Sequence, residues 1–217
     1  MSSLFLFDII QIRMKIVLFL MNVNFCMLDY LYCIIHPLGL IRKQMKVSCS
    51  VLEDWRLCTG CCACYSVCPV EAIVMKENNE GFLYPEIDMG KCIKCGKCIK
   101  ICPSHRQNST QNIFFASFAL KNTDQIRNIS QSGGAFYALA ALILAQSGIV
   151  YGCVLNDNFI AVHSRIESIE ELMPVHGSKY IQSEIRETFN QVHRDLNEGK
   201  MVLFSGTPCQ IAGLKAI

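Results

Sequence analysis

CTGCCACYSVCP, residues 58–69, and CIKCGKCIKICP, residues 92–103, share the spacing C-x2-C-x2-C-x3-C-P. The chain has 217 residues and fourteen cysteines, a content that would suggest disulfides in a secreted protein. Spacing decides otherwise, because eight of the fourteen cysteines fall in these two runs, where closely spaced thiolates suit metal ligation. The six cysteines outside the runs are Cys26, Cys33, Cys49, Cys62, Cys153 and Cys209.

Both runs match the ligand run of bacterial ferredoxins, which bind 4Fe-4S clusters. In two-cluster ferredoxins the first three cysteines of a run bind one cluster, and the fourth binds the other. The resemblance therefore implies two 4Fe-4S clusters and a crossed ligand set. One cluster takes Cys58, Cys61, Cys64 and Cys102, and the second takes Cys92, Cys95, Cys98 and Cys68.

Zinc is the alternative metal, because paired CxxC sequences also bind it. Zinc needs four thiolates per site but has no use for two crossed runs, so the spacing favours clusters. Gly60 and Gly96 are expected to let the backbone approach sulfur closely. Cys62 stands where Gly or Ala is commoner, and we interpret it as a bystander thiol or a competing ligand.

Overall composition limits the partners and the compartment. Hydrophobic residues make up 52% of the chain and charged residues 18%, so we expect a folded core. The net charge is +2, and with neither a basic stripe nor an acidic tail no nucleic-acid partner is indicated. Clusters and free thiolates survive where sulfur is kept reduced, which predicts a cytoplasmic protein.

Residues 1–50 form an apolar N-terminal extension whose role the sequence does not define. A membrane helix needs about 20 mostly apolar residues, and residues 16–35 approach this length. Asparagines and Asp29 interrupt them, and a carboxylate near the middle of a span is costly. We expect an extension packed against the protein, or a stretch read from upstream of the true start. A membrane anchor through residues 16–35 is the alternative.

Residues 112–217 alternate between strand and helix signals, which predicts an α/β sheet. Gly148 is expected to end the first helix, and Ser168-Ile-Glu-Glu to begin the second as a capping box. Strands are expected over residues 113–120, 149–155, 159–166 and 201–204, with helices over residues 135–146, from 168, over 181–196 and after the 205–209 turn.

Three segments of this second part resemble the beta subunit family of coenzyme F-420 hydrogenases and dehydrogenases. They read SQSGGAF (residues 130–136), GSKYIQ (177–182) and VLFSGTPCQIAGL (202–214), in the family's order. The resemblance implies a flavin-dependent domain, often binding FAD, that exchanges electrons between iron-sulfur clusters and an organic hydride carrier. Family members continue further, so residues 112–217 are expected to be the N-terminal part of an incomplete domain.

The predicted fold is thus an α+β ferredoxin-like two-cluster module, residues 51–107, followed by a truncated α/β flavin-type domain, residues 112–217. Ser132, Gly133 and Gly134 open a helix whose free amides would suit a flavin phosphate, with a simple N-cap as the alternative. The remaining candidates for cofactor binding are Lys179, Gly206, Thr207 and Cys209.

These candidates have alternative interpretations of their own. Lys179 would hold a phosphate or stabilise a reduced flavin, whereas a lone lysine is more often a surface charge. The turn containing Gly206 and Thr207 follows a strand, where ligands of open α/β sheets bind. Cys209 is a thiol near the cofactor, a further ligand or a packed side chain. His163 and His176 are interpreted as structural, and no catalytic residue is assigned.

Three functions are compatible with these features. In the first, a flavin splits a two-electron hydride into single electrons for the two clusters. In the second, the chain is a noncatalytic electron-transfer subunit that docks a redox partner protein or subunit. In the third it is a membrane-tethered redox adaptor. Neither the electron donor nor the acceptor can be read from the residues, and coenzyme F-420 itself rests on the family name.

Overall fold

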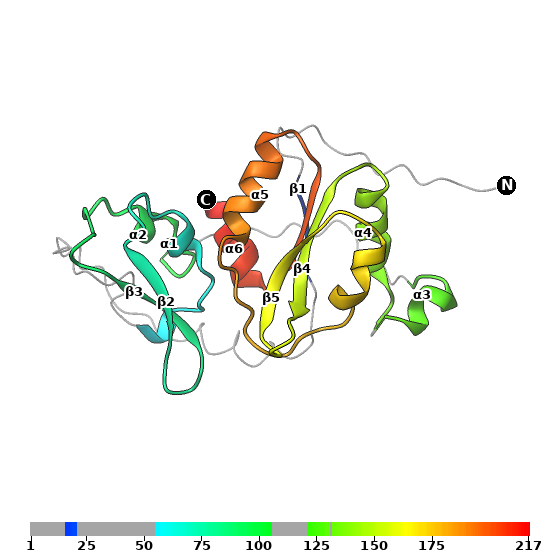
Figure 1. Cartoon of the computed structure of the whole chain (residues 1–217), viewed down its shortest axis with the longest axis horizontal. Coiled ribbons are helices and arrows are strands. Elements are labelled where there is room, and N and C mark those ends of the chain that lie inside the picture. Colours follow the sequence, from blue (N-terminus) through cyan, green and yellow to red (C-terminus); the bar gives the residue numbers. More distant parts are fainter. Residues whose placement is uncertain (1–15, 21–54, 106–120, 131) are drawn as a thin grey trace, which may run out of the picture.

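The structure is a computed structural model that describes residues 16–20, 55–105, 121–130 and 132–217. Its strands form a two-stranded sheet and a four-stranded sheet. Figure 1 shows the small sheet with α1 and α2 on one side of the molecule and the large sheet on the other, with α5 and α6 between them.

The small sheet is an antiparallel hairpin of β2 (Ile73–Glu77) and β3 (Leu83–Ile87). Gly81 has a left-handed φ of 83° in its turn, and the Asn78 side-chain oxygen accepts hydrogen bonds from the amides of Glu80 and Phe82. Gly81 and Asn78 thus close the turn between the two strands. Around the hairpin lie η1 (Trp55–Leu57), α1 (Ala63–Ser66) and α2 (Lys97–Ile101).

The large sheet has the strand order β1-β6-β4-β5. β6 pairs in parallel with both β1 and β4, and β5 joins β4 as an antiparallel hairpin, as predicted. β4 and β6 are nearly continuous apolar runs, which is typical of strands covered on both faces. The strands are β1 (Ile16–Leu20), β4 (Ile149–Leu155), β5 (Ala161–Ile166) and β6 (Val202–Gly206).

Helices cover the two faces of this sheet. Val150 and Leu203 point to a core shared with α4 (Ala135–Leu144) and η2 (Glu170–Val175). Their neighbours in the strands point to the opposite core, against α5 (Thr188–Asn197) and α6 (Pro208–Ala216). The short helix α3 (Asp124–Asn128) precedes α4.

The end of α4 differs from the prediction. The left-handed residue that follows the helix is Ser147, with φ 56°, while Gly148 donates its amide to the carbonyl of Ile143. A Cβ on Gly148 would lie 2.6 Å from Ile143 Cγ2 and 2.7 Å from the Met201 carbonyl oxygen. Gly148 is therefore required by close packing against the residue before β6 and not by a left-handed backbone.

The helix predicted over residues 181–196 begins only at Thr188, so the prediction is wrong for its first turns. Glu184 instead makes a parallel bridge with Val162, and backbone hydrogen bonds join it to Ala161 and His163. The segment around Glu184 is thus extended along β5. Its apolar residues have the spacing of a helix, but the backbone there is not helical.

The capping box predicted at Ser168 does not form in the predicted way. The segment folds as the 3-10 helix η2, its N-cap is Ile169, and the Glu171 carboxylate accepts the amide of Glu167. Pro174 lies inside this short helix and has no amide to donate to an α-helical ladder.

The N-terminal extension is described only over β1, which lies beside β6. The remainder of the membrane-anchor alternative, residues 21–35, and the strand predicted over residues 113–120 lie outside the described residues. In the described part of the chain, no helix has both the length and the apolar character needed to cross a bilayer.

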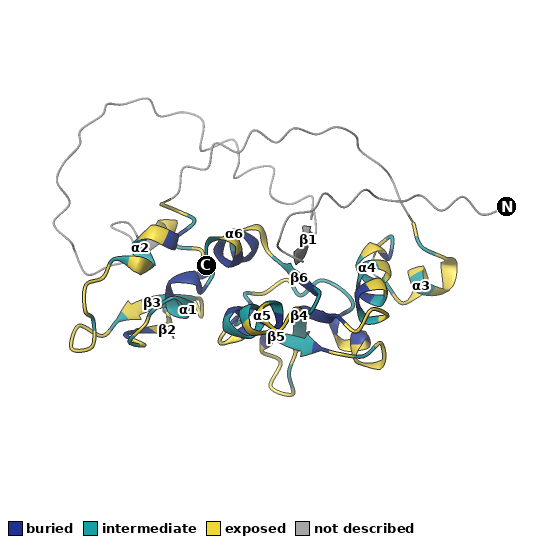
Figure 2. Cartoon of the chain, turned by 90° about the horizontal axis from the view of Figure 1, so that it is seen from above, coloured by how far each residue is buried: buried dark blue, intermediate teal, exposed yellow. Residues whose placement is uncertain are grey.

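The two parts of the chain share one apolar core. Cys62, Ala63 and Ile101, from the cysteine-rich part, are buried in the same cluster as Phe189 and Leu214 of α5 and α6. Figure 2 shows this continuity as dark blue segments of α1 and α6 facing each other. The large sheet domain is therefore packed directly against the first cysteine run.

Candidate functional site

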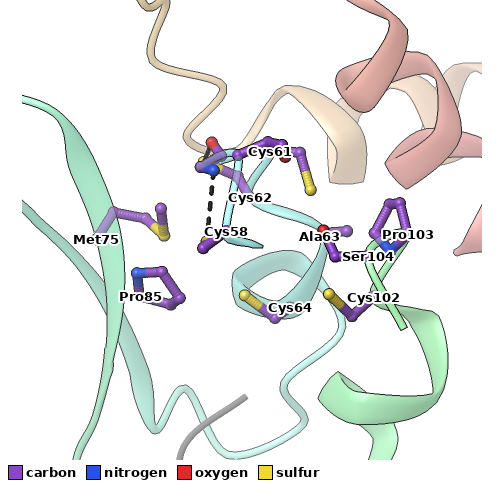
Figure 3. Close-up of a pocket in the computed structure, with 12 residues that line it drawn as sticks. Cys58, Cys61, Cys62, Ala63, Cys64, Met75, Pro85, Cys102, Pro103 and Ser104 are labelled. Carbon is purple, nitrogen blue, oxygen red and sulfur yellow. Dashed lines mark hydrogen bonds between the residues drawn. The ribbon is translucent and has the colours of Figure 1, made fainter. Parts of the chain in front are cut away.

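The first pocket lies between α1, the end of α2 and the β2–β3 hairpin. Met75 and Pro85 of the hairpin form one wall (Figure 3). The Cys61 sulfur points toward those of Cys64, in α1, and Cys102, which follows α2. The four predicted ligands that line the first pocket are Cys58, Cys61, Cys64 and Cys102.

The second pocket lies farther along the same face of the hairpin, where Ile73 and Ile87 line it. The structure thus brings together three cysteines of one run and the fourth of the other in each pocket. The cysteines of the second pocket are Cys68, Cys92, Cys95 and Cys98.

The two cysteine runs have the same backbone shape despite different residues. The third position is left-handed in both, with φ 64° at Gly60 and 54° at Lys94. The fifth position is also left-handed, with φ 63° at Cys62 and 70° at Gly96, and each is the N-cap of the following short helix. Gly60 and Gly96 are therefore not equivalent to each other, and Cys62 occupies a position that favours glycine.

Burial shapes the chemistry of the first pocket. It raises the pKa of the Cys58 and Cys64 thiols and raises that of Cys61 to about 11. Such thiols stay protonated at neutral pH unless the positive charge of a metal replaces the proton. The Gly60 amide donates to Cys58 Sγ at 3.5 Å, and in the second pocket the Ala72 amide donates to Cys68 Sγ at 3.2 Å.

Within the described residues, no three His, Cys, Asp or Glu side chains converge closely enough to hold a single metal ion. The fit to a cofactor therefore rests on the pockets, each of which contains four of the predicted ligand thiols and an amide directed at one of those sulfurs. That donor set suits the irons of a 4Fe-4S cluster.

Cys62 lines the first pocket but is only 2% exposed and packs in the shared core. Its thiol donates to the Gly60 carbonyl at 3.5 Å, and burial raises its pKa to about 12. These contacts favour a packed thiol over a competing ligand.

The sheet domain covers the first pocket. A Cβ on Gly213 of α6 would lie 3.4 Å from Cys61 Sγ and 3.1 Å from Ala63 Cβ. The Gln182 side chain hydrogen bonds to both the amide and the carbonyl of Leu83, at 2.7 and 3.3 Å. Sequence reasoning assigned Gln182 no role, since partners 99 residues apart leave no local signal.

A further contact between the two parts joins Tyr65, one residue after Cys64, to Glu187, which precedes α5. The Tyr65 hydroxyl donates to the Glu187 carboxylate at 2.7 Å. This hydrogen bond raises the pKa of Tyr65 to about 12 and holds the pKa of Glu187 below its usual value.

The predicted flavin residues at the start of α4 form a tight turn. Gly134 is its N-cap, with φ 79°, and its Cβ position lies 3.0 Å from Asn122 Cβ. The Asn122 amide donates to the Gly133 carbonyl at 2.7 Å, and its side-chain nitrogen to that of Gly134 at 3.3 Å. Ser132 is exposed beside them. These contacts account for the turn as a local N-cap.

Lys179 is half-buried, and its ammonium group contacts backbone carbonyls near the end of η2. Its ammonium group donates to the carbonyls of Pro174, His176 and Gly177 at 2.7, 3.0 and 3.1 Å. An ammonium group has three protons, so all three are used in closing the end of η2. The structure therefore gives Lys179 a structural role.

The turn after β6 ends the strand and begins α6. Thr207 is the N-cap in a capping box with Gln210, whose side-chain oxygen accepts the Thr207 amide at 2.8 Å. Cys209 Sγ lies 3.1 Å from Thr207 Oγ1. Gly206, the last residue of β6, has no room for a Cβ beside Gln210 Oε1, at 2.8 Å.

The two histidines have unpartnered buried nitrogens. His163 stacks on Phe204, its Nε2 lies 3.0 Å from the Ser205 carbonyl oxygen, and burial lowers its pKa to about 4. Its Nδ1 has no partner, nor has either ring nitrogen of His176, which packs edge-on against Tyr137. The structural interpretation thus leaves three ring nitrogens unexplained.

Comparison with known proteins gives partial matches. The chain is 25% identical over 179 residues to a subunit of the F(420)H(2) dehydrogenase of Methanosarcina mazei, covering 74% of this chain and 48% of that one. It is 44% identical over 46 residues to a subunit of the Na(+)-translocating ferredoxin:NAD(+) oxidoreductase complex of Acetobacterium woodii, covering 21% and 13%. It is 33% identical over 66 residues to a subunit of the NADH-quinone oxidoreductase of Geobacter metallireducens, covering 28% and 50%.

The chain thus spans half or less of the length of each of these relatives. All three are named as oxidoreductase subunits, which supports an iron-sulfur electron-transfer protein. The matches do not single out the coenzyme F-420 hydrogenase beta subunits within that group. Residues 57–105 match the 4Fe-4S dicluster domain, and this part of the chain is an iron-sulfur domain of the ferredoxin type.

Proposed function

We propose that the chain is an electron-transfer subunit whose two pockets each hold one 4Fe-4S cluster. Cys58, Cys61, Cys64 and Cys102 would hold the first, and Cys68, Cys92, Cys95 and Cys98 the second. The observation that carries this proposal is the division of the eight cysteines between two pockets, each lined by three cysteines of one run and the fourth of the other. Each cluster supplies one-electron chemistry when bound.

The protein's own contribution is to position the clusters and to exclude water from the first. Apolar side chains on one face of the β2–β3 hairpin line both pockets, Met75 the first and Ile73 the second. The amides of Gly60 and Ala72 donate hydrogen bonds to the sulfurs of Cys58 and Cys68. Such hydrogen bonds to ligand sulfurs shift the reduction potential of a cluster. A reducing compartment such as the cytoplasm would suit these thiols.

The partner of this subunit would be another subunit of an oxidoreductase complex. The relatives from Methanosarcina mazei and Acetobacterium woodii are named as subunits, one of a dehydrogenase and one of a ferredoxin:NAD(+) oxidoreductase complex. The first aligns over most of this chain. The organic redox partner of such a complex would be a hydride carrier.

A more specific proposal divides the chain into a cluster domain, residues 51–107, and a flavin-binding domain, residues 112–217. Its support is the likeness to the F(420)H(2) dehydrogenase relative and the turns at Gly134 and Gly206, which lie at helix starts. The noncatalytic alternative is favoured by Lys179, whose protons are all engaged by carbonyls. FAD would need to bind through the remaining residues of these segments.

Anaerobic reconstitution of the full chain tests these proposals. We expect about eight irons and eight sulfides per chain, together with the EPR signals of reduced 4Fe-4S clusters. Zinc in place of iron, or fewer than about seven irons, contradicts the two-cluster proposal. Flavin absorbance after addition of FAD supports the finer proposal, and its absence from a chain full of iron favours the noncatalytic subunit.

A further inference from the structure

The segment around the second pocket is strongly basic. Residues 89–105 contain four lysines and no Asp or Glu, whereas residues 57–70, around the first pocket, contain no charged residue. The net charge of +2 for the whole chain does not reveal this local concentration of lysines. The four lysines, all exposed, are Lys91, Lys94, Lys97 and Lys100.

Exposed apolar residues alternate with these lysines in the sequence, beside a predicted cluster ligand. Ile93 is 61% exposed and Met89 48% exposed, and Cys95 is itself exposed. Lys97 lines the second pocket, and Lys100 follows three residues later on the same side of α2. Figure 2 shows α2, partly exposed, on the side of the cysteine-rich part away from the large sheet.

In the part of the chain that the structure describes, the first run is uncharged and lies partly against the chain's own α6 and Gln182, with Gly213 beside Cys61. An electron exchanged with another protein would therefore pass most directly at the second pocket. An apolar centre within a polar rim is the usual anatomy of an interface, and a rim of one sign selects a partner of the other sign.

We propose that the lysine face, formed by Met89, Lys91, Ile93, Lys94, Lys97 and Lys100, docks an acidic electron-transfer protein. The inference rests on the proposed function, because it needs a cluster in the second pocket. In the docked pair one electron leaves the reduced chain and its partner gains that electron, so that no other reactant is needed. Opposite charges would steer the encounter and orient the exposed Cys95 side toward the partner.

A nucleic acid is the other polyanion that a basic surface could attract. The acidic protein is favoured because the lysines lie beside Ile93, Met89 and the exposed predicted ligand Cys95. They do not line a groove of aromatic rings on which the bases of a nucleic acid could stack. Nucleic-acid binding is therefore one outcome of the test below.

The test measures binding of the reconstituted full chain to an acidic flavodoxin by isothermal titration calorimetry at low and high salt. We expect Lys94→Glu/Lys97→Glu to weaken binding at low salt about tenfold or more, because steering charges act over this range. The matched control, Lys121→Glu/Lys215→Glu, makes the same charge change at exposed lysines outside the face and should alter affinity less than about twofold.

Two further measurements keep the result clear. The pair Lys91→Glu/Lys100→Glu, outside the pocket lining, should weaken binding as Lys94→Glu/Lys97→Glu does. Electron transfer from the reduced chain is measured by stopped flow. In both lysine-face variants its rate should be lower than in the wild-type chain with the acidic flavodoxin as acceptor, and higher with the basic cytochrome c.

Three outcomes would overturn the proposed docking at the lysine face. They are equal effects on affinity in the lysine-face and control variants, binding that does not depend on salt, and tighter binding of a single-stranded oligonucleotide than of flavodoxin. Iron content separates this failure from that of the proposed function. If the chain contains about eight irons and its affinity for flavodoxin does not change with the substitutions, only the docking surface is contradicted. A chain with fewer than about seven irons contradicts the cluster proposal on which the docking surface rests.

Discussion

The two cysteine runs that line the pockets have the same backbone conformation, but they differ in the residues around them. Left-handed residues occupy the third and fifth positions of both runs, and a short helix follows each. The first run carries no charged residue and α6 packs against its Cys61, whereas the second run has the exposed Cys95 and four exposed lysines within residues 89–105. The ligand positions thus fix the pocket, while the residues between ligands decide whether it faces the chain's own core or a partner.

The largest test of this comparison removes the fourth ligand of each run in turn. Cys68→Ala should lose the cluster of the second pocket, although Cys68 belongs to the first run, and Cys102→Ala should lose that of the first. Each variant should retain about four irons of eight, as counted by iron and sulfide analysis.

The surviving cluster is identified by its access to solvent. In Cys68→Ala it lies under α6 and should release iron slowly to a chelator, whereas in Cys102→Ala it is exposed and should release iron quickly. Cys62→Ala is the control and should keep about eight irons, because this thiol packs in the core. Release rates in the reverse order would show that the ligands are not crossed.

The second test compares glycines that differ in their surroundings. Gly96→Ala places a Cβ in open space, so only the left-handed backbone opposes it, at about 1–2 kcal/mol. Gly60→Ala adds a Cβ 2.1 Å from Gln182 Nε2 and 2.6 Å from the Leu83 carbonyl oxygen, which breaks the contact between the two parts. We expect a total cost of about 3 kcal/mol or more for Gly60→Ala.

Thermal unfolding of the two reconstituted variants measures this difference. The midpoint should fall further for Gly60→Ala than for Gly96→Ala, and chelator should reach the first cluster faster only in Gly60→Ala. Similar midpoints and similar chelation rates would mean that the sheet domain does not close the first pocket.

Spacing was sufficient to predict the local parts of this molecule. The cysteine runs predicted which thiols share each pocket, and short apolar runs predicted the bounds of β4 and β5 within two residues. Both features depend on residues close in the chain, where period and turn residues carry the information.

Contacts between distant residues could not be predicted in the same way. Apolar residues from 181 onward have helical spacing, yet pairing of Glu184 with β5 holds them extended. Asp195 is 5% exposed and accepts hydrogen bonds from Tyr151 and Arg165, which lie 44 and 30 residues away. Tertiary pairing overrides local preference at both places.

The smallest expected effect concerns the hydrogen bond between Tyr65 and Glu187, which joins the first pocket to the sheet domain. Tyr65→Phe removes one exposed hydrogen bond and should cost about 0.5 kcal/mol. Tyr180→Phe, at a tyrosine that is 79% exposed and does not line either pocket, is the control for removal of a tyrosine hydroxyl and should leave chelation of the first cluster unchanged.

The pH dependence separates this hydrogen bond from a packing effect. The raised pKa of Tyr65 means that its contribution is complete below pH 10 and is lost as pH rises toward about 12. The lowered pKa of Glu187 means that its contribution is complete above pH 4.5 and is lost only as pH falls below that value. The difference in unfolding free energy between the wild-type chain and Tyr65→Phe should therefore stay constant from about pH 6 to 9 and shrink above about pH 10. A difference that persists at high pH would assign the effect to lost packing around the ring, and the hydrogen bond would then have no part in covering the first pocket.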